Sequence, residues 1–579
     1  MKRLFTIVCI VVLSIVLSSS VYTQNNSIAS GTPLKIYASG DFLNNIINAN
    51  LASANPASEY DLVSTDTTYV FNGPITSNKN LTIVGVPNAT TQRPPCIQPW
   101  TLADFSIPAN LFVLNGSQTT ATFSNLYLLG LSNDNQPAGT GTTAGSASGT
   151  AIQVSADSVS IVANKVIFEQ WLGFAIGTSG NWTNVTVTNS VFRNMAHPSQ
   201  YYVGEAFRNE WSASGTPMGN IVMDNNAFVC LNGYASAPVT KQICKYFEFC
   251  HNDVIYTAKN PLFIFGATTA KVDNNIFYGT YSIGVNYTEN PWWDNLTEPD
   301  TTYSVIAFQP MDSVVGAQFG AGESARTIEV LNNNCYWPSA ITSWWSTFNA
   351  GQTWSSTGNA ILTPTWMNAR TTAAFNDKTT YPHLNATGNT AVNPVFGKAL
   401  DTVLTGGGVY GTGMIPWMQQ IRLNAAPSIA WGYKMTKVDS TSKNWVPTWP
   451  LPEVADLKYT ATLTGSDGKA VGDTNFVSGG SMAVRSNENT PVKFGLSAAY
   501  PNPFNPSTNF KFTIQNSGLI NLKIYNILGQ VVGTIVNNQF YSLGTYSIRI
   551  DMTNMASGVY FGVLEQGNNR SVQKMMLLK

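Results

Sequence analysis

The chain has 579 residues, 44% of them hydrophobic and only 11% charged, so it can bury an extensive core and is not a disordered protein. Its 30 Lys and Arg residues balance 31 Asp and Glu residues, which provides no basic surface for nucleic acid or anionic lipid. Abundant Asn, Thr, Ser and Gly with few charges is typical of β structure joined by polar turns.

Residues 1–23 have the three-part layout of a secretory signal peptide. Lys2 and Arg3 precede an apolar run over residues 4–17, and small residues follow. The run is too short for a comfortable membrane span, although an uncleaved anchor is the alternative. We expect cleavage near residues 20–24, and no later segment is long and apolar enough to cross a bilayer.

Five cysteines follow this segment. Their odd number and wide scatter do not predict a disulfide framework, and no pair has the spacing of a zinc site. Two possibilities remain open for them. One is a single disulfide among Cys230, Cys244 and Cys250, and the other is burial as small hydrophobic side chains.

A short pattern recurs between residues 60 and 340: an Asn after a β-prone stretch, then any residue, then two apolar residues. Its shorter spacings fit one coil of a parallel β-helix, which needs roughly 20 to 25 residues. Asn suits the corner of a coil because it tolerates the left-handed backbone region, and stacked Asn side chains can form a hydrogen-bonded ladder. The instances are Asn125, Asn164, Asn189, Asn225, Asn252, Asn274 and Asn333.

The stretch "YVFNGPITSNKNLTIVGVPN" at residues 69–88 resembles the early coils of pectate-lyase-like right-handed β-helix proteins. This resemblance covers roughly residues 35–430, and it concerns the fold more than the activity. We therefore predict a right-handed parallel β-helix with loop insertions over residues 30–430. An ordinary β-sandwich with fortuitous Asn turns is the alternative.

Three insertions interrupt or close this coil. Residues 132–151 form a Gly, Thr and Ser-rich loop, and the Trp-rich stretch 336–366 is expected to form a lid or side flap. Within a closing segment and linker over residues 431–493, "LTGSDGKAVGDTNF" resembles a short closing motif found after such helices in secreted bacterial proteins. Its Asp467 and Asp473 are able to contact a cation, but the motif reads better as a turn.

The segment "AYPNPFNPSTNF" at residues 499–510 cannot continue a helix or a central strand, because its prolines fix φ and lack a backbone donor. Short alternating segments follow and predict a small antiparallel β-sandwich over residues 494–579. Together, "YPNPFNPSTNFKF", "LKIYNILGQVV", "ASGVYFGVLEQ" and "KMMLLK" strongly resemble the type A C-terminal sorting domain of the type IX secretion system.

This resemblance implies a Gram-negative bacterium of the Bacteroidetes and Ignavibacteria kind. It implies the type IX secretion machinery as a partner, passage across the outer membrane, and either release or attachment to the outer cell surface. An ordinary adhesion or carbohydrate-binding sandwich is the alternative for this domain.

A pectate-lyase-like coil can act as a polysaccharide lyase, which needs a base for the proton beside a uronate carboxylate and a cation or arginine to stabilise the resulting charge. The densest group of ionisable residues is "RNMAHPSQYYVGEAFRNEW". Its catalytic candidates are Arg193, His197, Glu205, Arg208 and Glu210. A solvated, salt-bridged loop is the simpler interpretation, and no distinctive lyase, esterase or hydrolase motif is present.

Other residues predict binding rather than catalysis. Acidic side chains near neighbouring corners are candidate ligands for calcium, the one cofactor we consider: Asp224, Glu248 and Asp253. Four tryptophans are candidate platforms for sugar rings, with loop anchoring as the alternative role: Trp292, Trp293, Trp344 and Trp345. The sequence thus predicts an all-β, surface-directed protein that engages polysaccharide or serves as an adhesive element. The alternative is an enzyme, either a polysaccharide lyase or a glycan hydrolase.

Overall fold

The computed structural model describes most of the chain from residue 33 onward. It leaves out residues 39, 66, 105, 133–146, 196–202, 210–215, 237–241, 265, 286–303, 312, 319, 321, 354, 356, 398–399, 406–412, 424–448, 450, 452, 460–462, 478–493, 515–517, 542–543, 554 and 568. The signal peptide expected at residues 1–23 lies outside the described residues. The chain divides into two compact units, Met1–Ser481 and Met482–Lys579, which we call the coil and the C-terminal domain.

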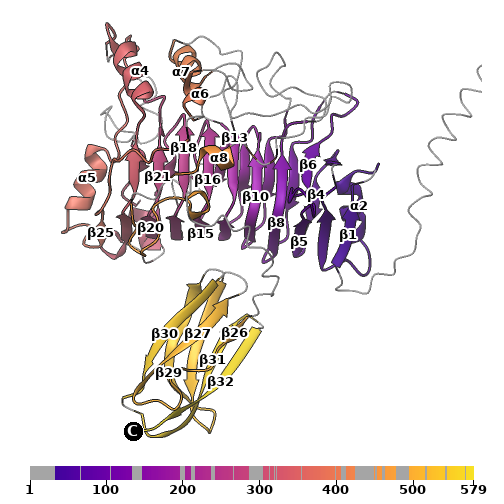
Figure 1. The fold of residues 1–579 in the computed structure, drawn as a ribbon, viewed down its shortest axis with the longest axis vertical. Helices are drawn as coiled ribbons and strands as arrows, with labels where there is room; N and C mark the ends of the chain where they lie inside the picture. Colours follow the sequence, from indigo (N-terminus) through magenta and orange to yellow (C-terminus); the bar gives the residue numbers. More distant parts are fainter. Residues whose placement is uncertain are drawn as a thin grey trace, which may run out of the picture. The chain divides into compact units, whose positions relative to one another are not determined.

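The coil is a parallel β-helix built from columns of strands that stack turn upon turn (Figure 1). The first column consists of β1 (Pro33–Tyr37), β2 (Glu59–Val63), β5 (Leu81–Val86), β8 (Thr120–Leu129), β10 (Ser160–Glu169), β12 (Thr183–Thr188), β15 (Met218–Asp224), β17 (Cys244–Cys250), β20 (Ala267–Asp273), β23 (Thr327–Leu331) and β25 (Leu384–Asn385). The second column consists of β3 (Tyr69–Phe71), β6 (Cys96–Pro99), β13 (Val191–Met195), β16 (Ala227–Leu231), β18 (Asp253–Thr257), β21 (Ile276–Tyr278) and β24 (Asn334–Tyr336). Strands β8 and β10 belong to both, because each continues around the corner between them.

A third column closes the coil. It consists of β4 (Ile75–Ser77), β7 (Asn110–Leu114), β9 (Thr150–Val154), β11 (Phe174–Thr178) and β14 (Glu205–Asn209), and the short pair β19 (Leu262–Phe263) and β22 (Ile306–Ala307) forms a separate parallel sheet. All of these pairings are parallel. The expected fold class is confirmed, because the large sheet is parallel throughout and the coil interior is one continuous apolar core.

Two neighbouring positions at each corner between the first and second columns carry the asparagines. The outer position has a left-handed φ, between 51° and 60°, at Asn125, Lys165, Asn189, Asn225, His251, Asn274 and Asn332. The next residue points inward, and five asparagines there form the ladder Asn226, Asn252, Asn275, Asn333 and Asn389. The sequence pattern therefore mixed asparagines of the outer position with asparagines of the inner position. Both positions favour Asn, but for different reasons.

Each rung of this ladder is held by side-chain amides at 2.8–3.1 Å. The same carbonyl oxygens also accept from backbone amides, as Asn275 Oδ1 does from the Asn252 N–H at 2.8 Å. Beside the ladder, Phe168, Phe192 and Phe228 stack with ring centroids 4.7 and 4.8 Å apart. A polar ladder in an apolar interior is tolerated because nearly every donor and acceptor has a partner.

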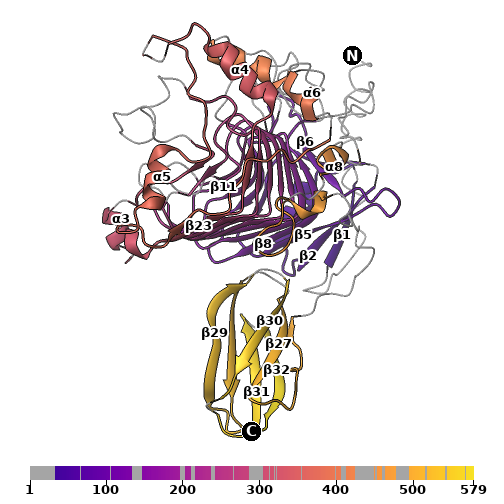
Figure 2. The same ribbon diagram turned by 60° about the vertical axis from the view of Figure 1, so that its left-hand side comes forward.

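Helices cover one end and part of the outside of the coil. α2 (Leu43–Leu51) packs on the first turns, while α3 (Ser313–Gln318) and α5 (Ala369–Asn376) lie near the last (Figures 1 and 2). A second apolar cluster joins the outer face of β16, β18 and β21 to α4 (Ser339–Asn349), α6 (Leu400–Thr405), α7 (Met414–Arg422) and residues 457–477; η2 (Glu323–Ala325), α8 (Glu453–Asp456) and η3 (Thr474–Phe476) are short. The chain therefore covers the outside of these three strands of the second column.

The C-terminal domain is a sandwich of two antiparallel sheets around its own apolar core. One sheet contains β26 (Gly495–Leu496), β27 (Ser507–Ile514) and β30 (Gly544–Asp551). The other contains β28 (Gly518–Tyr525), β29 (Val531–Tyr541), β31 (Gly558–Gln566) and β32 (Asn569–Leu577). None of the helices in the described part of the chain is long and apolar enough to span a membrane.

Candidate functional site

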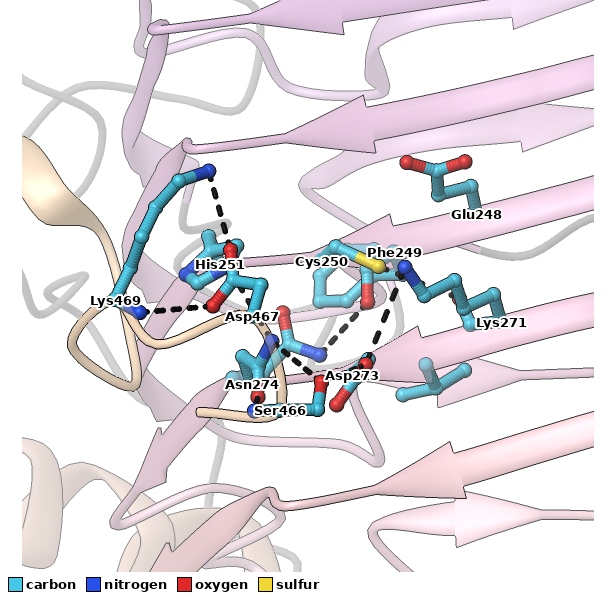
Figure 3. Close-up of polar contacts among 12 residues, drawn as sticks. Glu248, Phe249, Cys250, His251, Lys271, Asp273, Asn274, Ser466, Asp467 and Lys469 are labelled. Carbon is cyan, nitrogen blue, oxygen red and sulfur yellow. Dashed lines mark hydrogen bonds and ion pairs between the residues drawn. The ribbon is translucent and has the colours of Figure 1, made fainter. Parts of the chain in front are cut away.

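The loop at residues 463–477 docks onto the left-handed corner column of the coil (Figure 3). Thr474 donates its N–H and its hydroxyl to Asn225 Oδ1 at 2.9 and 2.6 Å. At the next corner, the ring nitrogens of His251 lie 3.1 Å from the Ala470 carbonyl oxygen and 3.1 Å from an Asp467 carboxylate oxygen. The corners therefore act as a docking column for a segment more than 200 residues away in sequence.

Within the docked loop, the acidic side chains hold turns. Asp467 accepts the Lys469 N–H at 3.0 Å and pairs with its ammonium at 3.1 Å, and Gly468 supplies a positive φ of 80°. Asp473 caps η3 by accepting the N–H and side-chain amide of Asn475 at 2.9 and 2.8 Å. This is the turn expected from the sequence, with both carboxylates accepting hydrogen bonds from within the loop.

A buried pair of carboxyl groups lies beneath this loop. Asp253 Oδ1 accepts the Asp473 N–H at 3.0 Å, and both side chains are almost completely covered. Burial and the neighbouring Asp473 raise the pKa of Asp253 well above its usual value. Burial also raises the pKa of Asp473 well above its usual value, and Asp224 adds to this effect. The pair therefore favours protonated, neutral forms.

The candidate calcium ligands do not form one cluster. Burial and the neighbouring Glu248 raise the pKa of Asp224 to about 6, whereas Asp253 faces Asp473 instead. Glu248 accepts the Tyr246 hydroxyl and lies in register with Lys271 on the next strand. No group of three or more His, Cys, Asp or Glu among the residues with described positions is arranged to hold a metal ion.

Arg193, the first of the catalytic candidates, is buried. Its guanidinium lies 3.2 Å from Glu169 Oε1 with only 1% of the side chain exposed. Glu169 also accepts the Asn194 amide at 2.7 Å and the Tyr127 hydroxyl. In this structure Arg193 is therefore part of a buried polar network. His197 and Glu210 lie outside the described residues.

Glu205 and Arg208 lie together at the end of the third column. Arg208 Nη1 is 3.1 Å from Glu205 Oε1. Burial raises the pKa of the Glu205 carboxyl to about 7, although the charges of Arg208 and Lys259 oppose the shift. Gly233 packs directly on this side chain, since a Cβ there would lie 2.4 Å from Glu205 Cγ. Glu205 Oε2 is buried without a hydrogen-bond partner among the residues the structure describes.

Sequence reasoning missed Phe174, which completes this group. The Arg208 guanidinium carbon lies 5.4 Å from the centre of the Phe174 ring, a distance at which cation and ring attract each other. Register places Gln153, Gly177 and Arg208 in one outward row across three strands. Phe174, Gln153 and Arg208 are each partly exposed. The only available signal was an aromatic residue between two glycines, which does not specify a site.

The described tryptophan candidates are buried instead of exposed. Trp344 and Trp345 are only 8% and 5% exposed. Both come from α4, and the Trp345 indole N–H donates to the Ser282 carbonyl oxygen at 2.7 Å. They therefore anchor α4 to the coil, the alternative role open from the sequence, and their faces are not available to a sugar ring. Trp292 and Trp293 lie outside the described residues.

All five cysteines after the signal segment are buried and none is in a disulfide in this structure. Burial raises the pKa of each of Cys96 and Cys244 to about 12. They behave as small hydrophobic side chains, which was one of the two possibilities open from the sequence.

The family model of the secretion system C-terminal sorting domain matches residues 498–578. This confirms the sorting domain expected from the four terminal motifs. No curated protein and no solved structure matches the chain significantly. Because a domain of this kind marks proteins exported by the type IX secretion system, the protein is directed to the cell surface or the extracellular space.

Proposed function

We propose that the coil binds extracellular polysaccharide through the outer row of its third column, centred on Phe174 and Arg208. The observation that carries this proposal is the partly exposed Phe174 ring beside the Arg208 guanidinium, which Glu205 holds in place. An aromatic face stacks on the apolar face of a sugar ring, and a guanidinium recognises a carboxylate with paired hydrogen bonds. This chemistry favours an acidic polysaccharide that contains uronate.

Two further features support the same row. The outside of β16, β18 and β21 in the second column is covered by α4, α6, α7 and the docked loop, so these strands offer no open face for a polymer. Along the third column, Thr76, Val113 and Gln153 continue the row in register on successive strands, and all three are at least partly exposed. An extended chain is recognised best by such a linear series of side chains. We include in this proposal the expectation that the coil resembles pectate-lyase-like proteins.

The test measures retention of the full mature chain on immobilised uronate and neutral polysaccharides. Phe174→Ala is expected to weaken retention on the uronate polymer by about tenfold, because it removes the stacking face. Trp100→Ala is the matched control, since Trp100 is 40% exposed but follows β6 in the second column. Equal retention by the two variants and the unaltered protein would remove the basis of the proposal.

A polysaccharide lyase at this row is the second candidate. It is favoured by the Glu205 carboxyl, whose pKa of about 7 suits a base that acts near neutral pH, beside a guanidinium able to stabilise the developing charge. Glu205 is buried in this structure. The residues that cover its carboxyl must therefore move apart before it can take a proton from a substrate. The measurement is the ultraviolet absorbance of unsaturated products. The lyase candidate requires products from the unaltered protein and none from Glu205→Gln. If the unaltered protein binds the polymer without forming products, only polysaccharide binding remains.

A further inference from the structure

The C-terminal domain carries an unusual share of the exposed apolar side chains. Among the residues described, thirteen large hydrophobic side chains are exposed, and six of these are in this domain, the much shorter of the two units. The six are Tyr500, Ile527, Leu528, Val531, Val572 and Leu578. Single exposed hydrophobics are ordinary, but a concentration of them marks a contact surface.

The two most exposed aliphatic residues of the domain are adjacent at one turn. Ile527 and Leu528 are 73% and 77% exposed and occupy the turn between β28 and β29. Gly, Asn, Asp and Ser are the usual residues at such positions. Nothing in the described fold uses these two side chains, because neither belongs to the core of the domain.

The turn is held in one conformation by Asn526. Its Oδ1 accepts the N–H groups of Leu528 and Gln530, each at 3.0 Å. Its side-chain amide donates to Gln530 Oε1 at 2.9 Å, and Gly529 provides a φ of 76°. The apolar pair is therefore presented in a fixed geometry, and binding pays little for ordering it.

Strand register places this turn at the end of the domain that also holds the C-terminus. Tyr525 pairs with Phe561, and Gly558, three residues earlier at the start of β31, pairs with Leu577. The exposed Val531 and Leu578 therefore lie at the same end as Ile527 and Leu528. The chain enters the domain at the opposite end, because β26 pairs with Phe512 and Thr513 at the far end of β27.

We propose that this apolar end, Ile527, Leu528, Val531 and Leu578, is the docking surface for a protein of the outer-membrane secretion machinery. A sorting domain works by being recognised, and residues 498–578 match that family. The surface is preorganised, apolar and distant from the point at which cargo joins the domain, so a receptor is able to engage it whatever the cargo. The expected partner surface is an apolar pocket that accepts the Ile527 and Leu528 side chains.

The export assay uses the full chain in a Gram-negative host that carries the type IX secretion machinery. The double variant Ile527→Ser with Leu528→Ser is expected to reduce the exported fraction by about tenfold or more. The reason is that the complex with the partner loses two aliphatic side chains that the partner would bury. Val572→Ser is the matched control, because Val572 is 46% exposed but lies midway along β32, paired with Val563. The conservative pair Ile527→Leu with Leu528→Met should retain export.

A second measurement separates loss of binding from loss of folding. Protease resistance of the retained double variant should equal that of the unaltered protein, since both side chains are exposed. A photoreactive residue at position 528 in the otherwise unaltered chain should cross-link to an outer-membrane protein of the machinery. Normal export of the serine variant, or cross-links only to a second copy of the chain or to lipid, would overturn the proposal. Glycan retention by the coil is measured separately and does not bear on it.

Discussion

The coil and the C-terminal domain fill their interiors in different ways. In the described part of the coil, buried polar and charged residues are numerous, and they include the asparagine ladder, the Glu169–Arg193 pair and the Asp253–Asp473 pair. The C-terminal domain has a single buried polar residue within its described part, Thr508. Exposed apolar side chains gather instead at one end of this domain.

This difference follows from how the two folds are stacked. A coil repeats the same corner at each turn, so an amide at one level always finds an amide at the next, and burial of a polar side chain is compensated. A sandwich has no such repeat, and an inward Asn there would lack a partner. The coil thus depends on hydrogen-bond matching, whereas the C-terminal domain depends on apolar packing.

The largest expected effect comes from breaking the ladder. Asn275→Ala removes the acceptor of the Asn252 N–H and the donor to the Phe249 carbonyl oxygen, at 2.8 and 2.7 Å. Two buried backbone groups lose their partners, which costs about 4 kcal/mol of coil stability. All 15 tryptophans precede residue 482, so urea unfolding followed by tryptophan fluorescence reports the coil alone.

The control for this variant is Asn45→Ala, because Asn45 is an exposed residue of α2. It should change the coil by less than about 0.5 kcal/mol. If Asn275→Ala and Asn45→Ala unfold at the same urea concentration, the ladder is not a source of stability.

The second effect tests the apolar domain. Phe510 is fully buried in the C-terminal core, and Phe510→Ala should destabilise that domain by about 3 kcal/mol through lost burial and a cavity. Hydrogen exchange of peptides from β27 and β31 should accelerate, while the tryptophan transition stays unchanged. A shift of the tryptophan transition would show that the two units do not unfold independently.

The third effect concerns pH. The pKa of Asp473 is raised above its ordinary value of 3.8, so the folded coil binds protons that the unfolded chain has released. This contribution to stability is complete below the unfolded pKa and is lost as pH rises through the folded pKa. Asp473→Asn keeps an acceptor for the Asn475 N–H and removes the titration. The coil of the variant should therefore be more stable than the unaltered coil at about pH 8 and similar near pH 3.

Urea midpoints at several pH values, again followed by tryptophan fluorescence, provide this measurement. Asp104→Asn is a suitable control, because Asp104 is an exposed residue whose pKa is lowered by its hydrogen bonds to Ser106. A parallel pH dependence for Asp473→Asn and the unaltered protein would contradict the buried carboxyl pair.

The smallest effect is expected at the edge of the docked loop. Asp467 is partly exposed and pairs with His251 and Lys469, each at 3.1 Å. Asp467→Ala should cost no more than about 1 kcal/mol of coil stability, since partly exposed pairs contribute little. The sensitive measurement is protease cleavage within residues 463–477, which should become faster. A loss as large as that of Asn275→Ala would mean that the docked loop, rather than the ladder, controls coil stability.

The sequence by itself determined the parallel coil, the antiparallel C-terminal domain and the export route. These follow from local patterns: a corner residue that recurs once per coil, alternating strands after a proline-rich boundary, and terminal motifs in a fixed order. It did not separate the two corner columns. Asn252 and Asn333 fit the pattern but belong to the inner ladder, next to the left-handed His251 and Asn332. Asn164 precedes the left-handed Lys165 and lies in neither corner column.

Only the tertiary structure decided which charged and aromatic side chains are accessible. Arg193 is buried in an ion pair with Glu169. Trp344, a candidate platform from the sequence, is buried between α4 and the coil. Phe174 became a candidate because Arg208, from the next turn of the coil, lies beside it. Exposure depends on segments far apart in the chain that pack over each strand, and periodicity along one strand contains no information about that covering.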